Sequence, residues 1–370
     1  MNRKRTSIEF VRFWASISIL LFHFGSFYLE EGHYFPLSFI FVEFFFLVSG
    51  FFMMMHITER ENPLAPPFYV WRKIKGFFPP LAIAFFVQYI IFTLSNGLSS
   101  VTEVLRNLFH FKWEFLLLHA AGFIQDPQFG RDYLMGQTWY LSAMVIALII
   151  AYPLALHFRK FFLYTVCPLA VILIYAFLIQ TMGTLNVGNE YVGFVLAAIL
   201  RGFAGTCMGA LSYCAYRAMK AQDFCLRYKP FVTGIEVGSY VAVASLFFRG
   251  RNMSAQDSLF YVLCFAVFVI LGCLDQTAVS RFLNGHGTRA LTFLGDYSLY
   301  LYLCHWNVVM GLKYFLPGWM GLPAFAVYLP VVLLYALALM AFDRKRKGSK
   351  PVVILCLVLI ATACCVPYIP

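Results

Sequence analysis

The chain has 370 residues, of which 61% are apolar and only 12% are charged, whereas soluble domains typically contain about 45–50% apolar and 25% charged residues. This composition excludes a soluble enzyme and predicts a polytopic membrane protein. The formal net charge of +11 does not point to nucleic acid, because the basic residues form short clusters between apolar segments, as in the cytoplasmic loops of membrane proteins.

The sequence predicts an all-α fold, a bundle of transmembrane helices. Each predicted helix is apolar and about as long as a bilayer-spanning helix needs to be. The Lys/Arg clusters fall on one side if the N-terminus is cytoplasmic, with Arg249 and Arg251 as the main exceptions. The expected spans are residues 8–28, 35–57, 77–94, 138–157, 161–181, 192–216, 231–248, 257–277, 289–313, 322–342 and 352–369.

The first expected span contains two polar side chains, Arg12 and His23, eleven positions apart. That spacing is close to three helical turns, so both side chains project from nearly the same face, roughly 16 Å apart along the axis. An ionisable residue in a membrane span is costly and by default indicates a functional site. The alternative is that Arg12 reaches the lipid headgroups and that His23 is a packing residue.

The second expected span contains Glu43 and the pair Ser49-Gly50. It runs antiparallel to the first, which puts Glu43 at a depth similar to that of His23. A carboxylate hydrogen-bonded to one imidazole nitrogen orients the ring and raises the basicity of the other nitrogen. Alternatively, Glu43 pairs with an arginine or stays protonated. Ser49-Gly50 can simply allow close helix packing, and Ser49 lacks the G-x-S-x-G context of a catalytic serine.

The expected loop from Thr58 to Gly76 is rich in proline and then basic, ending in Arg72-Lys73-Ile74-Lys75. Basic side chains at the cytoplasmic membrane surface bind anionic headgroups or the phosphates of a nucleotide-bearing co-substrate. Lipid anchoring is the other interpretation. The loop follows the span with Glu43 and lies on the same side as Arg12, which favours the co-substrate.

The ninth expected span contains Ser298, Tyr302 and His305, spaced four and three residues apart. They therefore form a polar stripe on one helix face, which either lines the path of a substrate or hydrogen-bonds neighbouring helices. The expected outer loop 95–137 is rich in aromatic residues. We assign these to the interfacial belt, with sugar stacking as the alternative.

Four stretches resemble the integral-membrane acyltransferase family 3, whose members modify bacterial surface glycans. They are Arg12 with His23, the run from Glu43 to Phe52, the basic Arg72-Lys73-Ile74-Lys75, and the run from Tyr297 to Trp306. In addition, Trp139-Tyr140-Leu141-Ser142 is similar to an element of the family's fourth helix. The resemblance extends over residues 8 to about 342.

The resemblance implies a ten-helix acyltransferase core over residues 1–345, with 346–370 as an additional C-terminal transmembrane helix. It also implies a location in the bacterial inner (plasma) membrane. The implied reaction is O-acyl transfer, most often of acetyl, from cytoplasmic acyl-CoA to a hydroxyl of a surface polysaccharide or lipid-linked glycan. No metal and no permanently bound cofactor are expected.

In this interpretation His23 is the general base and Glu43 orients it. Arg12, Arg72, Lys73 and Lys75 hold the phosphates of the donor. The remaining candidates are acceptor-binding or structural residues: Ser49, Trp139, Ser142, Ser298, Tyr302 and His305.

A proton-coupled transporter or a lipid or glycan flippase is the rival from another class, because such carriers also use intramembrane Arg, His and Glu. The sequence contains neither an internal repeat nor a matching pair of Gly/Pro-broken helices, which many carriers have. A purely structural partner in an export complex would leave the intramembrane charges unexplained.

Overall fold

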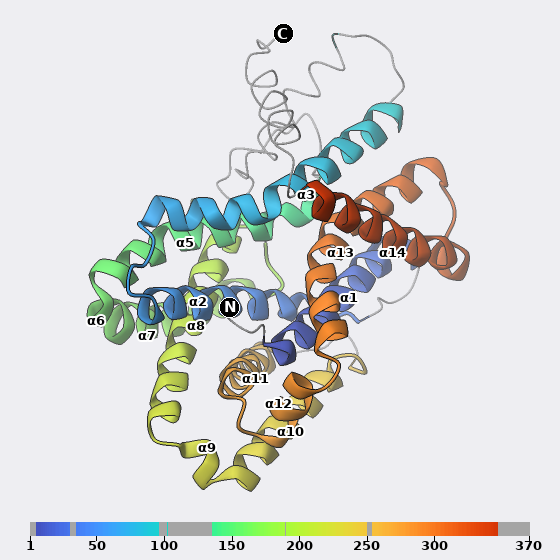
Figure 1. The fold of residues 1–370 in the computed structure, drawn as a ribbon. Coiled ribbons are helices and arrows are strands. Elements are labelled where there is room, and N and C mark those ends of the chain that lie inside the picture. The colour runs from blue at the N-terminus through green and yellow to red at the C-terminus, as the bar shows by residue number, and fades with distance from the viewer. Residues whose placement is uncertain are drawn as a thin grey trace. The chain divides into compact units, whose positions relative to one another are not determined.

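The computed structural model describes residues 5–29, 35–95, 102, 135–188, 190–249 and 254–346. These residues are almost entirely helical (Figure 1). The strands that they contain are β1 (Tyr191–Val192) and β2 (Val195–Leu196), which form one short antiparallel pair. The predicted all-α polytopic bundle is therefore confirmed.

The order of the helices follows the order of the expected spans. Short 3-10 or π turns lead into several of the helices: η1 (Ser38–Ile40), η4 (Gly136–Thr138) and η5 (Phe162–Val166). The α-helices are α1 (Thr6–Tyr28), α2 (Phe41–Glu59), α3 (Pro66–Ser95), α5 (Trp139–His157), α6 (Arg159–Phe161), α7 (Cys167–Met182), α8 (Ala197–Ala221), α9 (Phe224–Arg227), α10 (Lys229–Ser245), α11 (Ala255–Leu274), α12 (Ala278–Gly285), α13 (Thr288–Phe315) and α14 (Gly321–Arg346).

Seven helical segments in the described residues are long and apolar enough to cross a membrane, so the chain is a multi-pass membrane protein. Helices also form at the expected spans 192–216, 231–248 and 289–313, but these are shorter or more polar. The expected span 352–369 and most of the expected outer loop 95–137 lie outside the described residues. The seven segments are Thr6–Tyr28, Ser38–Glu59, Pro66–Ser95, Gly136–His157, Arg159–Met182, Gln256–Leu274 and Gly321–Lys345.

The expectation of a loop from Thr58 to Gly76 is wrong for most of that segment. Helix α3 begins at Pro66, so the basic run Arg72-Lys73-Ile74-Lys75 is helical. Proline suits the first turn of a helix, because its φ is preset and the missing N–H has no partner there. The residues that follow are compatible with a helix, so only residues 60–65 connect α2 to α3. Arg72 and Lys75 are three residues apart and both are exposed.

The described chain divides into two compact units. Unit 1 comprises Met1–Phe22, Phe35–Val70 and Ala143–Ser298. Unit 2 comprises His23–Tyr34, Trp71–Ser142 and Leu299–Pro370. The boundaries fall inside α1, α3, α5 and α13, so each of these four helices contributes residues to both units.

In unit 1, α2 packs closely against α8 because glycines at the contact leave no side chain between the two backbones. A Cβ added at Gly50 would overlap the Thr206 carbonyl, and one at Gly209 would overlap the Leu47 carbonyl. This close packing is the alternative that the sequence left open for Gly50. Small residues let membrane helices approach one another in this way.

We expect Gly209→Ala to lower the stability of the protein. The added methyl group would push α8 away from the backbone of α2, an overpacking cost of about 1–3 kcal/mol. Thermal unfolding of the detergent-solubilised protein measures the effect. Gly238→Ala on α10 is the matched control, because a Cβ there meets nothing within 4 Å. Equal unfolding temperatures for the two variants would contradict the packing described here.

The connection between α2 and α3 is held in unit 1 by hydrogen bonds to Leu64. Its N–H donates to Nε2 of His56 at 3.3 Å, and its carbonyl accepts from the Tyr152 hydroxyl at 2.6 Å. The Tyr152 ring stacks on Tyr69 in the first turn of α3, with centroids 4.1 Å apart. These contacts hold the start of α3 at Pro66, six residues before the basic run.

In unit 2, α13 is hydrogen-bonded to three other helices. The side-chain amide of Asn307 donates to the Ala84 carbonyl of α3 at 2.7 Å. The Tyr300 hydroxyl donates to Asp343 of α14 at 2.9 Å. The Tyr28 hydroxyl, at the end of α1, donates to the Val309 carbonyl at 2.5 Å. These bonds satisfy polar groups that lipid could not.

Candidate active site

His23 lies in unit 2 between two aromatic side chains of α13. Its ring stacks on the imidazole of His305, with centroids 5.2 Å apart and planes inclined by 22°. The indole of Trp306 approaches the same imidazole edge-on, with centroids 5.4 Å apart. The end of α1 therefore presents His23 to α13, and two imidazoles that are far apart in the sequence lie side by side.

His305 is buried and has one ring nitrogen with no hydrogen-bond partner among the described residues. Nδ1 lies 3.3 Å from the Leu301 carbonyl, one turn earlier on α13. A carbonyl only accepts, so this contact assigns the ring proton to Nδ1. Nε2 then carries a lone pair, and it is this atom that is buried without a partner. His305 can therefore accept a hydrogen bond from a bound hydroxyl.

The turn η4 is hydrogen-bonded to the part of α13 that carries His305. The Tyr302 hydroxyl donates to the backbone carbonyl of Gln137, and the side-chain amide of Gln137 donates to the Leu303 carbonyl at 3.5 Å. Oε1 of Gln137 is buried without a partner in the described structure. The indole of Trp306 occupies the space that a Cβ at Gly136 would need. Tyr302 thus hydrogen-bonds a neighbouring segment, one of the two roles the sequence left open.

Gln137 is a residue that the sequence analysis did not single out. It directly precedes Thr138 and Trp139, at the start of the fourth expected span, so the signal was a polar residue at the entrance of an apolar segment. Its importance follows from the tertiary structure, because only there does its amide face α13.

Glu43 lies in unit 1 and both of its carboxylate oxygens are bonded. Oε1 pairs with Nε of Arg201 at 2.8 Å, and Oε2 accepts from the Tyr175 hydroxyl at 2.6 Å. The side chains of Glu43 and Arg201 are 0% and 1% exposed. Arg201 also donates to the backbone carbonyls of Val187 and Phe39.

Pairing with an arginine is thus the alternative for Glu43 that the structure supports, while its orienting action on His23 stays a prediction. Arg201 was not singled out in the sequence, although it is a cation within an apolar segment, the same signal that drew attention to Arg12. A buried charge needs a partner, so Arg201 and Glu43 were candidates for each other.

Arg12 is paired with Glu9, one turn earlier on α1. Its Nη1 lies 3.0 and 3.2 Å from the two carboxylate oxygens of Glu9. The Arg12 side chain is 32% exposed and that of Glu9 11%. A Cβ at Gly295 of α13 would overlap the Glu9 side chain, so Glu9 is confined against α13 in unit 1. Arg12 and His23 lie on one continuous helix, as predicted.

The three candidate serines each hydrogen-bond the backbone of their own helix. Ser49 donates to Phe45 at 2.9 Å, Ser142 to Thr138 at 3.1 Å and Ser298 to Gly295 at 2.7 Å. Such bonds satisfy a hydroxyl inside a membrane helix without a functional partner. Ser298 belongs to unit 1, whereas Tyr302 and His305 belong to unit 2, so the predicted stripe divides between the units.

The remaining candidates stay predictions. Arg72 and Lys75 are exposed on α3 and Lys73 is half-buried, positions at which they can meet an anion. Trp139 is at the start of α5, with its ring 6.5 Å from that of Tyr140. In the described residues, no cluster of three His, Cys, Asp or Glu side chains is arranged to hold a metal ion.

A comparison with protein families gives a match over almost the entire chain. The family-3 model described as an acyltransferase domain matches residues 5–369, which includes every candidate residue above. Neither a curated protein nor a solved structure matches the chain significantly. The chain therefore belongs to acyltransferase family 3, the family its motifs resemble, and is a multi-pass membrane acyltransferase.

Proposed function

We propose that the protein is an O-acyltransferase of the bacterial plasma membrane. It takes an acyl group, foremost acetyl, from cytoplasmic acyl-CoA and transfers it to a hydroxyl of a surface polysaccharide or lipid-linked glycan. The observation that carries this proposal is the pair of stacked imidazoles, His23 and His305, with a cation, Arg12, about three turns before His23 on the same helix.

His23 acts as the general base on the acceptor hydroxyl. As its imidazole takes the proton, the hydroxyl oxygen attacks the thioester carbonyl carbon and forms a C–O bond. The tetrahedral intermediate then collapses, the C–S bond breaks, and the sulfur of CoA leaves with the proton returned by the imidazolium. The products are an O-acyl ester and free CoA thiol, so atoms and charge balance without another reactant.

The donor is bound by cations at the cytoplasmic end of the protein. Arg12 holds the phosphates of CoA through charge-assisted hydrogen bonds. Arg72 and Lys75, exposed on α3 in unit 2, are further candidates for the same role. The extended pantetheine arm then follows α1 from Arg12 towards His23, over a rise of roughly 16 Å. An anionic head and a long neutral arm suit a helix with a cation near one end and an imidazole near the other.

Two buried acceptor atoms favour a ligand that brings hydroxyl donors. Nε2 of His305 and Oε1 of Gln137 are both buried without partners in the described structure. A sugar offers several O–H groups, each of which can donate to such an atom. This chemistry supports a glycan acceptor over an apolar alcohol with a single hydroxyl.

The test is thioester consumption by the purified protein in detergent. With acetyl-CoA and a membrane glycan extract as acceptor, we expect acceptor-dependent release of free CoA thiol. The surface glycan of cells with the protein should also be heavier by one acetyl group per modified residue than that of cells lacking it. Glycan or lipid translocation without any thiol release would overturn the proposal and favour the transporter.

A further inference from the structure

Helix α1 is anchored at its two ends by different parts of the protein. Its first residues pack in unit 1 against α11, α12 and the start of α13. Its last turns pack in unit 2, where His23 meets His305 and the Tyr28 hydroxyl bonds Val309. Arg12 is therefore close to one anchor, and His23 belongs to the other.

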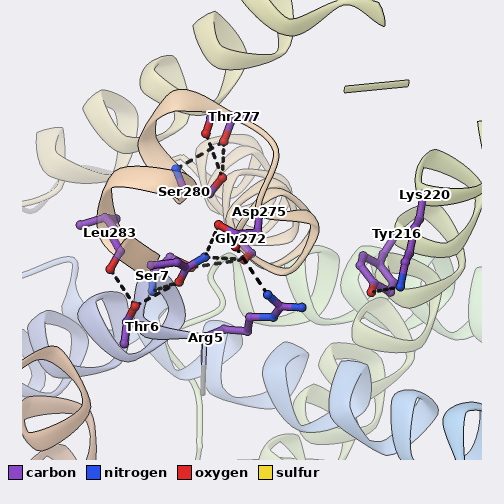
Figure 2. Close-up of polar contacts among 11 residues, drawn as sticks. Arg5, Thr6, Ser7, Tyr216, Lys220, Gly272, Asp275, Thr277, Ser280 and Leu283 are labelled. Carbon is purple, nitrogen blue, oxygen red and sulfur yellow. Dashed lines mark hydrogen bonds and ion pairs between the residues drawn. The ribbon is translucent and has the colours of Figure 1, made fainter. Parts of the chain in front are cut away.

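The first anchor is centred on a single amide, the side chain of Asn284 in the last turn of α12. Figure 2 shows Ser7 at the start of α1 beside Gly272 and Asp275. Oδ1 of Asn284 accepts from the Ser7 backbone N–H at 3.0 Å and from the Thr6 hydroxyl at 3.1 Å. Its Nδ2 donates to the Gly272 carbonyl at 3.3 Å and to Asp275 Oδ1 at 2.9 Å. Asn284 is 5% exposed. Its side-chain amide is therefore buried, and both its oxygen and its nitrogen are hydrogen-bonded.

The bond from Ser7 gives Asn284 the role of a helix cap supplied from another element. The first N–H groups of an α-helix have no partner within the helix, and a side-chain oxygen from a residue just before the helix normally satisfies one of them. Here the oxygen comes from α12, 277 positions away in the chain. The cap therefore satisfies an N–H group in the first turn of α1 and also holds the start of α1 against α11 and α12.

Two close approaches continue this anchor towards Arg12. A Cβ at Gly272 would lie 2.6 Å from the Ser7 hydroxyl oxygen, and one at Gly295 would overlap the Glu9 side chain. The side chains of Ser7 and Glu9 therefore lie directly against the backbones of α11 and α13. Because Glu9 is the partner of Arg12, the position of the guanidinium depends on where this end of α1 is held.

We propose that Asn284 is a positioning residue for the acyl donor: by capping α1 from α12, it places the Glu9–Arg12 pair where Arg12 receives the phosphates of CoA. This inference rests on the proposed function, since it takes acyl-CoA as the donor. Asn284 acts through Arg12 and does not touch the donor. Since His23 is held by contacts in unit 2, loss of the cap should affect recognition of the phosphates and spare the imidazole.

The test compares two thioester probes that differ in the phosphates. Acetyl-CoA carries the phosphates, and S-acetylpantetheine has the same arm and thioester without them. For Asn284→Ala we expect the dissociation constant of acetyl-CoA, measured by calorimetry on the detergent-solubilised full-length protein, to rise on the order of tenfold, the effect of one misplaced charge-assisted contact. The affinity for S-acetylpantetheine should not change.

Ser254→Ala is the matched control. Ser254 caps α11 through a capping box with Asp257, so this variant also loses a helix cap in unit 1, but not one on α1. It should bind acetyl-CoA as the unmodified protein does. The proposal is overturned if Asn284→Ala and Ser254→Ala weaken the binding of acetyl-CoA equally. It is also overturned if Asn284→Ala weakens the binding of both probes equally. In either case the role of Asn284 is only structural.

The reciprocal variant Asn284→Asp with Asp275→Asn provides the rescue, and it answers the question even if Asn284→Ala does not fold. It keeps an acceptor oxygen for Ser7 and reverses the hydrogen bond between residues 275 and 284. We expect it to bind acetyl-CoA within about threefold of the unmodified protein, allowing for the lost bond to Gly272. A folded double variant with no preference for acetyl-CoA over S-acetylpantetheine refutes the inference.

Failure of the unmodified protein to bind acetyl-CoA is a separate result, which overturns the proposed function together with this inference.

Discussion

Replacing His23 by alanine should abolish acyl transfer while the protein still folds and binds acetyl-CoA. The imidazole is the only base that the mechanism uses, and a positioned general base contributes about 10²–10⁴-fold to the rate. The donor phosphates are held about three turns away by Arg12, so the dissociation constant of acetyl-CoA should change little. The release of CoA thiol in the presence of a glycan acceptor measures the loss.

His286→Ala is the control for this experiment. His286 is an exposed histidine just after α12, stacked on Phe282 in unit 1, so its removal changes the histidine content without changing the imidazole pair. The control should retain the activity of the unmodified protein. If His23→Ala leaves glycan acetylation in cells at its original level, His23 is not the base and the mechanism is wrong.

The second large effect is expected on stability, from the buried pair of Glu43 and Arg201. Arg201→Met would leave the Glu43 carboxylate buried with the Tyr175 hydroxyl as its remaining described partner. Removal of one partner of a buried ion pair typically costs about 3–5 kcal/mol, because the other charge stays uncompensated. Thermal unfolding in detergent should therefore occur at a much lower temperature than for the unmodified protein.

A double variant separates this explanation from a simple loss of packing. In Arg201→Met with Glu43→Gln neither charge remains, so the double variant should be more stable than Arg201→Met alone. The exposed pair Arg249–Asp257, with side chains 48% and 40% exposed, supplies the control. Arg249→Met should cost no more than about 1 kcal/mol. If Arg201→Met unfolds at the temperature of the control, the pair does not carry the stability assigned to it.

Much of the fold could be predicted because membrane spans are a local property. A run of about twenty apolar residues has to become a helix in lipid, since no other backbone conformation satisfies its own hydrogen bonds there. The helices α1 and α5 accordingly lie within two residues of the expected spans, and α2 and α7 begin six residues later than expected. The start of α3 was missed, because a proline pair typical of a loop is equally suited to the first turn of a helix.

The candidate residues could be found from the sequence for a related reason. An ionisable side chain in an apolar run is rare enough to be noticed without knowing its neighbours, which is how Arg12, His23 and Glu43 were selected. One apolar run placed Arg12 and His23 on the same helix, and the regular pitch of that helix sets them about three turns apart.

Only the tertiary structure decided which of these groups meet. Glu43 pairs with Arg201, 158 positions away, His23 stacks on His305, and the cap of α1 is Asn284. Helical periodicity specifies the face on which a side chain lies, but not which helix packs against that face. That choice depends on the combined packing of many helices, with glycines such as Gly50, Gly209 and Gly295 determining how closely they approach.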